Sequence, residues 1–251
     1  MTGHIFVWDL ETVPDLVGYA RANGLEGEDP QSVRKAMGDA FPKLIYHSIV
    51  CIGAVIAKFD GDHWATTEVV ARHVGDRSEK TLIAGFVNKL DAIRPQLISF
   101  NGNAFDLPIL RYRAMVSEVS APALSKRAYF HRYSTDALDL CDVLASFNPG
   151  GRVSLDALAK ILGFAGKPTD LDGSQVEKYF NEGRIAEIAS YCESDVINTY
   201  RIWLRYELFR GSLTAEGYEK SQASLLASCE QKSLKDSLSA QQRVAEDNLA
   251  A

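Results

Sequence analysis

Several apolar runs along the chain predict β-strands. The first is Ile5-Phe6-Val7-Trp8, which is rich in strand-forming residues, continues into Asp9-Leu10-Glu11-Thr12 and ends at Pro14. Further apolar runs predict strands or extended segments at 48–59, 63–71, 97–100 and 137–140. Between the second and third runs stands Asp60-Gly61, a typical hairpin turn, so these two strands are expected to pair antiparallel.

Apolar residues spaced three and four apart predict helices around these strands. Ser78 is expected to cap a helix that runs to Ile93, and Pro95 ends it. The other predicted helices span 31–40, 105–116, 153–162 and 181–209, and the rest of 15–47 and 117–133 is expected to be irregular. Alternating strands and helices after a hairpin-linked start predict a single α/β domain with a mixed sheet.

Composition changes after Gly211, where small, polar and charged residues take over. We expect residues 1–210 to form the main domain. We expect residues 211–251 to form a polar C-terminal tail that is helical or partly disordered, and that is a possible contact for a protein partner.

The overall composition excludes several protein classes. The chain has 251 residues, of which 46% are hydrophobic, and 27 Lys and Arg against 33 Asp and Glu give a formal charge of −6. This is the mixture of a globular protein, and no apolar stretch approaches the ~20 residues that span a bilayer. Widely spaced cysteines and the absence of a signal-like N-terminus predict a cytoplasmic location without membrane attachment. The acidic balance argues against general charge-driven binding to nucleic acid, but not against contact at one local site.

A first candidate motif is the pair Asp9 and Glu11 at the end of the first strand. Side chains two apart on a strand point to the same face, so the two carboxylates are expected to lie side by side. Carboxylate oxygens in such a pair suit a hard divalent cation. Taken alone, the pair is more often two solvated acids at a strand end.

Two further motifs each carry an acid in a defined setting. In Asn101-Gly102-Asn103-Ala104-Phe105-Asp106, the acid opens a helix after a buried strand, where it could simply cap the helix. In Tyr191-Cys192-Glu193-Ser194-Asp195, the phenol and the acid are four apart and share a helix face. An ordinary hydrogen bond between these two side chains is an equally good explanation of the last motif.

In the order DxE, NxxxFD, YxxxD, the three motifs resemble the DEDD superfamily of 3′–5′ exonucleases. More narrowly, the chain resembles the stand-alone predicted exonucleases related to the proofreading domain of family B DNA polymerases, over about residues 4–207. Ser190 stands where the histidine subgroup carries His, and Tyr191 follows it, so the tyrosine subgroup is the better match. The resemblance implies a ribonuclease-H-like fold, a mixed five-stranded sheet flanked by helices.

The resemblance also implies roles for the motif residues. Asp9, Glu11 and Asp195 would bind one divalent cation, and Asp9 with Asp106 would hold a second. Two such cations, Mg²⁺ or Mn²⁺, would activate the attacking water and stabilise the departing 3′ oxygen. Tyr191 would orient the water, because a phenol with a pKa near its ordinary value of about 10 is a poor base.

The resemblance also implies which residues of this chain contact the substrate. Asn101 and Phe105 would hold the terminal nucleotide, and the backbone around Leu10 and Thr12 would read its 3′ hydroxyl. The expected function of residues 1–210 is therefore that of a metal-dependent 3′–5′ exonuclease, which acts on the 3′ ends of single-stranded DNA and releases nucleoside 5′-monophosphates. Exonucleolytic trimming of RNA 3′ ends is the alternative activity, and a non-catalytic nucleic-acid-binding module is the alternative class. Because only 211–251 follows, any proofreading would act in trans, unless the role is repair or turnover.

Two charged groups outside these motifs are also candidates. Asp136, Asp139 and Asp142 suit a strand-to-helix transition better than a metal site, and Asp139 could support the site from behind. The segment 107–135 is basic, and either a solvated surface or a rim that contacts phosphates explains it. Its basic residues are Arg111, Arg113, Lys126, Arg127 and Arg132.

Overall fold

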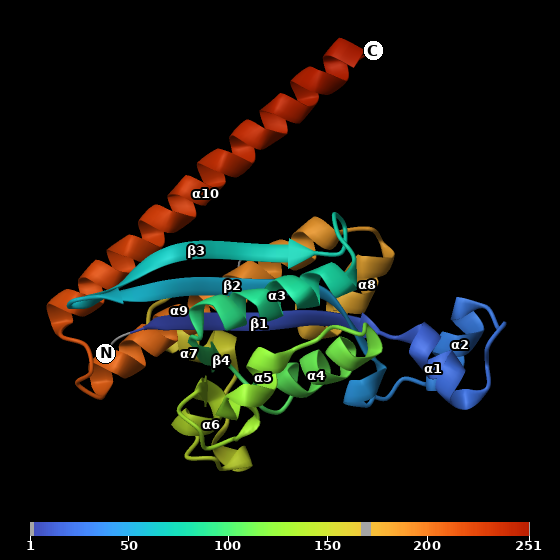
Figure 1. Ribbon diagram of the computed structural model, residues 1–251, viewed down its shortest axis with the longest axis horizontal. Coiled ribbons are helices and arrows are strands. Elements are labelled where there is room, and N and C mark those ends of the chain that lie inside the picture. Colours follow the sequence, from blue (N-terminus) through green and yellow to red (C-terminus); the bar gives the residue numbers. More distant parts are fainter. Residues whose placement is uncertain (1–2, 167–171, 251) are drawn as a thin grey trace.

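The computed structural model describes residues 3–166 and 172–250, with side chains up to residue 236. It contains one five-stranded sheet in the order β3-β2-β1-β4-β5, with helices on both faces (Figure 1). The strands are β1 (His4–Pro14), β2 (His47–Asp60), β3 (His63–His73), β4 (Gln96–Ser99) and β5 (Ala137–Asp139). Strands β1, β2 and β3 pair antiparallel, whereas β4 and β5 run parallel to β1. The expected mixed five-stranded sheet is confirmed.

Two helical layers enclose the sheet. One face packs against α3 (Glu79–Ile93), α4 (Asp106–Val116) and α5 (Pro122–Lys126), and the other packs against α7 (Leu155–Ile161), α8 (Val176–Asn181) and α9 (Ile185–Phe209). The remaining α-helices are α1 (Leu16–Asn23), α2 (Pro30–Met37), α6 (Leu140–Leu144) and α10 (Ala215–Ala250). Short 3₁₀ turns lie at η1 (Leu44–Tyr46), η2 (Ala128–Phe130), η3 (Pro149–Gly151) and η4 (Gly173–Gln175). None of the helices in the described part of the chain is both long and apolar enough to cross a membrane.

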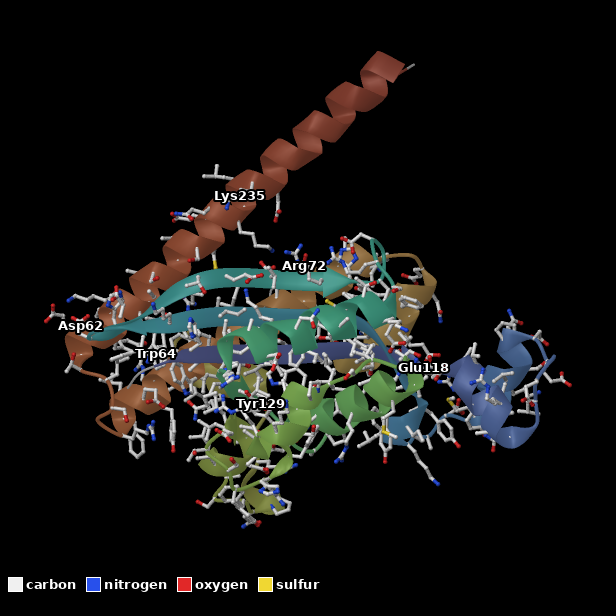
Figure 2. The ribbon with its side chains drawn as sticks, in the orientation of Figure 1. Asp62, Trp64, Arg72, Glu118, Tyr129 and Lys235 are labelled. Carbon is white, nitrogen blue, oxygen red and sulfur yellow. The ribbon has the colours of Figure 1, made fainter. Side chains whose placement is uncertain are left out.

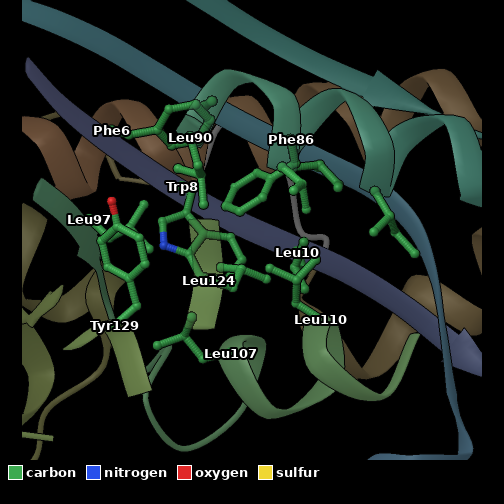
Figure 3. Packing of buried hydrophobic residues seen from close by; sticks show 14 of the residues in the cluster. Phe6, Trp8, Leu10, Phe86, Leu90, Leu97, Leu107, Leu110, Leu124 and Tyr129 are labelled. Atoms are coloured by element: carbon green, nitrogen blue, oxygen red, sulfur yellow. The ribbon is translucent and has the colours of Figure 1, made fainter. Parts of the chain in front are cut away.

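The core on the α3 face is built around aromatic rings of β1. Trp8 is 1% exposed, and its ring centroid lies 4.8 Å from that of Phe86 in α3 (Figure 3). Phe6 contacts the same ring edge-on at 5.0 Å. The buried Tyr129 closes this core and donates its hydroxyl to the Pro95 carbonyl at 2.7 Å. These contacts fix β1, and therefore the end of β1 that carries the two acids.

Three expected elements differ from the observed ones. The segment 117–133 is not wholly irregular, because α5, which has Pro122 in its first turn, and η2 lie within it. The segment after Pro14 is not irregular, because Asp15 caps α1 by accepting a hydrogen bond from the Gly18 N–H. The helix expected at 181–209 begins at Ile185, because Gly183 adopts a φ of 75° and separates α8 from α9. None of these differences moves a motif residue.

Helix α10 runs along β3 and covers that free edge of the sheet. The Ser221 hydroxyl accepts a hydrogen bond from the Trp64 N–H, and the Ser224 hydroxyl accepts one from the Thr66 N–H, both at 2.9 Å. Lys235 lies farther along, where the helix has left the sheet (Figure 2). An unpaired strand edge can pair with strands of other molecules, and here the two serines accept hydrogen bonds from two of its N–H groups. The division of the chain at residue 210 stays a prediction.

Candidate active site

The end of β1 places two acids on one face of the sheet. Trp8 and Leu10 belong to the core on the α3 face, whereas Val7 and Val13 pack on the opposite side. Asp9 and Glu11 alternate along β1 with Trp8 and Leu10, so both carboxylates point to the opposite face, toward α9. A register shift in the pairing with β2 follows immediately, between Glu11 and Thr12. Such irregularities re-aim side chains next to functional sites.

Helix α9 brings Tyr191 and Asp195 onto the same acids. Both side chains are buried, at 4% and 7% exposure. The close approach of the helix depends on Gly53, which lies opposite Asp9 in β2. A Cβ at Gly53 would lie 2.8 Å from Cys192 Sγ and 3.0 Å from the Cys192 carbonyl oxygen. Sequence analysis missed this glycine, although a glycine inside an apolar strand is a signal of close backbone approach.

Asp106 reaches the site from the other edge of β1. Strand β4 pairs with β1 only from Ile5 to Val7, which leaves the later backbone groups of β1 free on that side. The Leu10 N–H uses this freedom and donates to Asp106 Oδ1 at 3.2 Å. Asp106 itself is 3% exposed at the first turn of α4. The three motifs therefore converge at one end of β1.

The loop that carries Asp106 is held from behind by Asp139. Its two carboxylate oxygens accept hydrogen bonds from the backbone N–H groups of Asn101, at 2.8 Å, and of Asn103, at 2.9 Å. Asp139 also caps α6, directly after β5, so the predicted strand-to-helix role is confirmed. The loop is tight, since a Cβ at Gly102 would lie 2.5 Å from Ser99 Oγ.

Burial and mutual repulsion shift the titration of this cluster. The pKa of Glu11 is raised well above its usual range, first by burial, then by the charges of Asp9 and Asp195. Burial raises the pKa of Asp106 to about 7, against the lowering effect of the Leu10 N–H. The pKa of Tyr191 is raised by burial and by the neighbouring acids, Asp195 foremost. Four carboxyls and a phenol thus share one poorly hydrated space, where a cation would relieve the repulsion.

The donor atoms fit a hard cation. Ligand atoms of Asp9, Glu11 and Cys192 lie within 4.8 Å of one another. The Cys192 thiol keeps its proton, because burial raises its pKa well above the usual range, and it donates to the Asp9 carbonyl oxygen at 3.7 Å. Oxygen ligands therefore dominate the group, which favours ions such as Mg²⁺ or Mn²⁺ over thiolate-seeking metals.

The expected substrate contacts lie around the same end of β1. The Leu10 side chain is buried and its N–H is occupied by Asp106. Thr12 Oγ1 shares a hydrogen bond of 3.0 Å with His47 Nδ1. The ring centroid of Phe105 lies 5.4 Å from that of His47 and 5.8 Å from that of the exposed Phe41. Neither His47 nor Phe41 belonged to the sequence motifs.

The basic segment 107–135 was expected to be either a solvated surface or a phosphate-contacting rim, and neither alternative holds for all of its residues. Arg113 is 6% exposed and pairs with Asp15 at 2.5 Å and with Glu79 at 2.6 Å, so it ties α4 to the core. Arg127 pairs with Asp136 at 2.5 Å and donates to the Pro95 carbonyl. Both guanidinium groups donate to acceptors within the protein, and the spacing of residues along the chain does not predict these pairs. Arg111 and Arg132 do line a surface pocket.

Known proteins share sequence with much of this chain. The model of a family described as predicted 3′–5′ exonucleases related to the exonuclease domain of PolB matches residues 39–243. DNA polymerase 2 of Aeropyrum pernix is 29% identical over 160 residues, which are 59% of this chain and 20% of that protein. The DNA polymerase of Archaeoglobus fulgidus is 25% identical over 140 residues, which are 49% of this chain and 17% of that protein. The chain thus spans a fifth or less of the length of these curated relatives.

A solved structure of a DNA polymerase shares the fold. The family B DNA polymerase of the archaeon Pyrobaculum calidifontis superposes with a TM-score of 0.55 at 18% identity, covering 83% of this chain and 25% of that one. E. coli exonuclease I, in complex with an oligonucleotide, gives a TM-score of 0.44 at 11% identity, covering 88% of this chain and 42% of that one. The sheet order and its two helical layers are those of a ribonuclease-H-like domain, as expected.

Proposed function

This chain belongs to the family of predicted 3′–5′ exonucleases related to the exonuclease domain of PolB, and on that premise we propose that it is a metal-dependent exonuclease of the tyrosine subgroup. It would remove nucleotides from the 3′ ends of single-stranded DNA and release nucleoside 5′-monophosphates. The observation that carries the proposal is the convergence of Asp9, Glu11, Asp106 and Asp195 with Tyr191 at one end of β1.

The acids would hold two divalent cations. Asp9, Glu11 and Asp195 would bind one, and Asp9 with Asp106 would bind the other. Such ions supply the positive charge that phosphodiester hydrolysis needs at the attacking water and at the departing 3′ oxygen. The carboxylates must be ionised to bind them, so bound cations would bring the raised pKa values of Glu11 and Asp106 back toward their usual range.

Tyr191 would position the attacking water. Because its pKa is raised, the phenol keeps its proton at neutral pH and cannot act as a general base. It can still donate or accept one hydrogen bond, and its burial between α9 and the sheet, beside Val13 and Val50, limits the orientations of its ring. Orientation of this kind lowers the barrier by holding the reacting groups in line.

The substrate end would lie beside the aromatic group at the start of α4. Phe105 and the exposed Phe41 offer ring faces for stacking on a terminal base or sugar, a contact that tolerates any sequence. Asn101 and the backbone around Leu10 and Thr12 complete the proposed contacts. DNA is favoured over RNA because the two curated relatives are DNA polymerases. The cytoplasmic location, and a partner contact through the C-terminal segment, stay predictions.

A hydrolysis assay tests the proposal. Wild-type protein, Asp9→Asn and Asp91→Asn are incubated with 5′-labelled single-stranded DNA, duplex DNA and single-stranded RNA, in Mg²⁺, Mn²⁺ or EDTA. Asp91 is an exposed residue of α3, so its variant controls for the loss of a carboxylate elsewhere.

We expect stepwise shortening from the 3′ end of single-stranded DNA, lost in EDTA and in Asp9→Asn but kept in Asp91→Asn. Faster cleavage of RNA would make RNA the substrate and leave the proposed metal-dependent hydrolysis unchanged. Tight binding without any metal-dependent cleavage would identify a non-catalytic module and refute the proposal.

A further inference from the structure

A small basic pocket lies beside the loop that carries Asp106. It has a volume of about 180 Å³, and three arginines and one aspartate line it, which leaves two positive charges. We call it the arginine pocket. Its polar groups come from Asn103, Arg111, Arg132, Asp142 and Arg152.

Two buried donors of the arginine pocket lack acceptors within the described part of the chain. Arg152 donates from Nη1 to Asn101 Oδ1 at 3.2 Å and from Nη2 to Asp142 Oδ1 at 2.5 Å, which leaves its buried Nε without a partner. Asn103 Nδ2 is likewise buried without a partner among the described residues. Buried donors are almost always satisfied in native proteins, so both point to a ligand that brings acceptor oxygens.

The charge and size of the arginine pocket define that ligand. Asp142 stays ionised, because the hydrogen bond from Arg132 lowers its pKa, and it neutralises only one of the three arginines. The guanidinium group of Arg111 stacks on Phe130 at 4.5 Å from the ring centroid. Pockets for whole small molecules usually measure ~300–1,000 Å³. The smaller volume here suits a single anionic group with several oxygens, such as a phosphate.

The position of the arginine pocket links it to the acid cluster. Asn103 lies three residues before Asp106, and Asp139 holds the Asn101 and Asn103 N–H groups in place. Asn101, one of the expected substrate contacts, is itself bound by Arg152. One rigid loop therefore carries both the acid and the orphaned donor.

We propose that the arginine pocket binds a backbone phosphate of the nucleic acid strand, upstream of the 3′ end held at the acid cluster. This inference rests on the proposed exonuclease function for the direction of the strand, but not for the anion binding itself. A second contact of this kind would hold the strand after each cleavage and let it advance without leaving the protein.

The test measures binding and cleavage separately. Binding of a 5′-labelled oligothymidylate is followed by fluorescence anisotropy in Ca²⁺ over a series of salt concentrations. The proteins are wild type, Arg111→Gln, Arg152→Lys and Lys126→Gln. Lys126 is exposed in the same basic segment but outside the arginine pocket, so its variant removes a matched charge. Arg152→Lys keeps the charge beside Asp142 and removes the Nε donor.

We expect Arg111→Gln to weaken binding about tenfold and to reduce the slope of log K against log salt by about 0.7, the value for one phosphate of a single strand. Arg152→Lys should weaken binding with a smaller change in slope, and Lys126→Gln should match wild type. Wild-type binding in both pocket variants would overturn the proposal.

Two further measurements distinguish a free phosphate from a strand phosphate, and a failure of the pocket proposal from a failure of the exonuclease proposal. Calorimetry with inorganic phosphate tests for a free anion, and its binding to wild type with unchanged oligonucleotide affinity in Arg111→Gln would overturn the strand assignment. Hydrolysis of the p-nitrophenyl ester of thymidine 5′-monophosphate reports the acid cluster alone, because this substrate has one nucleotide. Ester cleavage with unaffected strand binding in the variants refutes the pocket only. Loss of strand binding in the variants, with no ester cleavage by wild type, refutes the exonuclease function only.

Discussion

Gly53→Ala should separate α9 from the acids of β1. The added Cβ would lie 2.8 Å from Cys192 Sγ, 3.0 Å from the Cys192 carbonyl oxygen and 3.1 Å from Val196 Cγ1. The thiol can rotate away, but the carbonyl belongs to the backbone of α9 and can move only with the helix. Restoring an ordinary contact of about 3.4 Å therefore requires α9 to retreat by roughly 0.4 Å at that point.

Two quantities should change. Overpacking costs about 1–3 kcal/mol, and the preference of a strand for alanine over glycine returns about 0.5–1 kcal/mol. The middle of these ranges gives a net loss of about 1 kcal/mol, which lowers the melting temperature by about 2–4 °C in a chain of this size. Because a misplacement of about 1 Å can cost a hundredfold in rate, a shift of roughly 0.4 Å should slow cleavage by roughly tenfold.

The matched control is Gly85→Ala in α3, where an added Cβ meets no atom within 4 Å. This change should raise the free energy of unfolding by about 0.5–1 kcal/mol and leave cleavage unchanged. Melting is followed by circular dichroism, and cleavage is measured well below both transitions. If Gly53→Ala melts and cleaves like wild type, the close approach of α9 is not what positions Tyr191 and Asp195.

Three further variants test separate parts of the reasoning. Tyr191→Phe should lower kcat about a hundredfold, the scale of lost proton and water positioning, without changing metal affinity measured by calorimetry. In metal-free protein, the Asp106 pKa of about 7 exceeds its ordinary 3.8, so the native state binds the extra proton and the free energy of unfolding should fall as pH rises from about 4 to about 7. Urea titrations should show this decline in wild type and a weaker one in Asp106→Asn. Ser221→Ala should cost about 1–3 kcal/mol in the same titrations, because it strands the buried Trp64 N–H.

Much of the fold was predictable because local chemistry decides it. Ser78 caps α3 by accepting from the Thr81 N–H, and Gly61 supplies the positive φ of the hairpin turn. The alternation along β1 put Asp9 and Glu11 on one face, as expected. Spacing alone also put Tyr191 and Asp195 on one face of α9. In each case the deciding neighbours are within a few residues along the chain.

The errors and omissions involve partners that are distant in sequence. The sequence predicted Arg113 to be a surface charge, but in the structure it pairs with Asp15 and Glu79, which are far away along the chain. Asp139 was expected to support the site, but the groups that it holds, the N–H groups of Asn101 and Asn103, follow only from β5 lying beside β4. Gly53 matters because of a helix that comes about 140 residues later, a contact that only the packed structure defines.

Burial of the acids at this site destabilises the folded protein when no cation is bound. Glu11 and Asp106 both have raised pKa values, so each opposes folding when it is ionised and no cation is bound. Replacing either acid with its amide removes repulsion and a metal ligand together. Such variants should therefore be more stable than wild type without metal at pH 8, and gain less stability on addition of Mg²⁺. A cluster kept for structural reasons alone would instead lose stability on the same replacement, so the sign of the change distinguishes a cation site from a buried polar network.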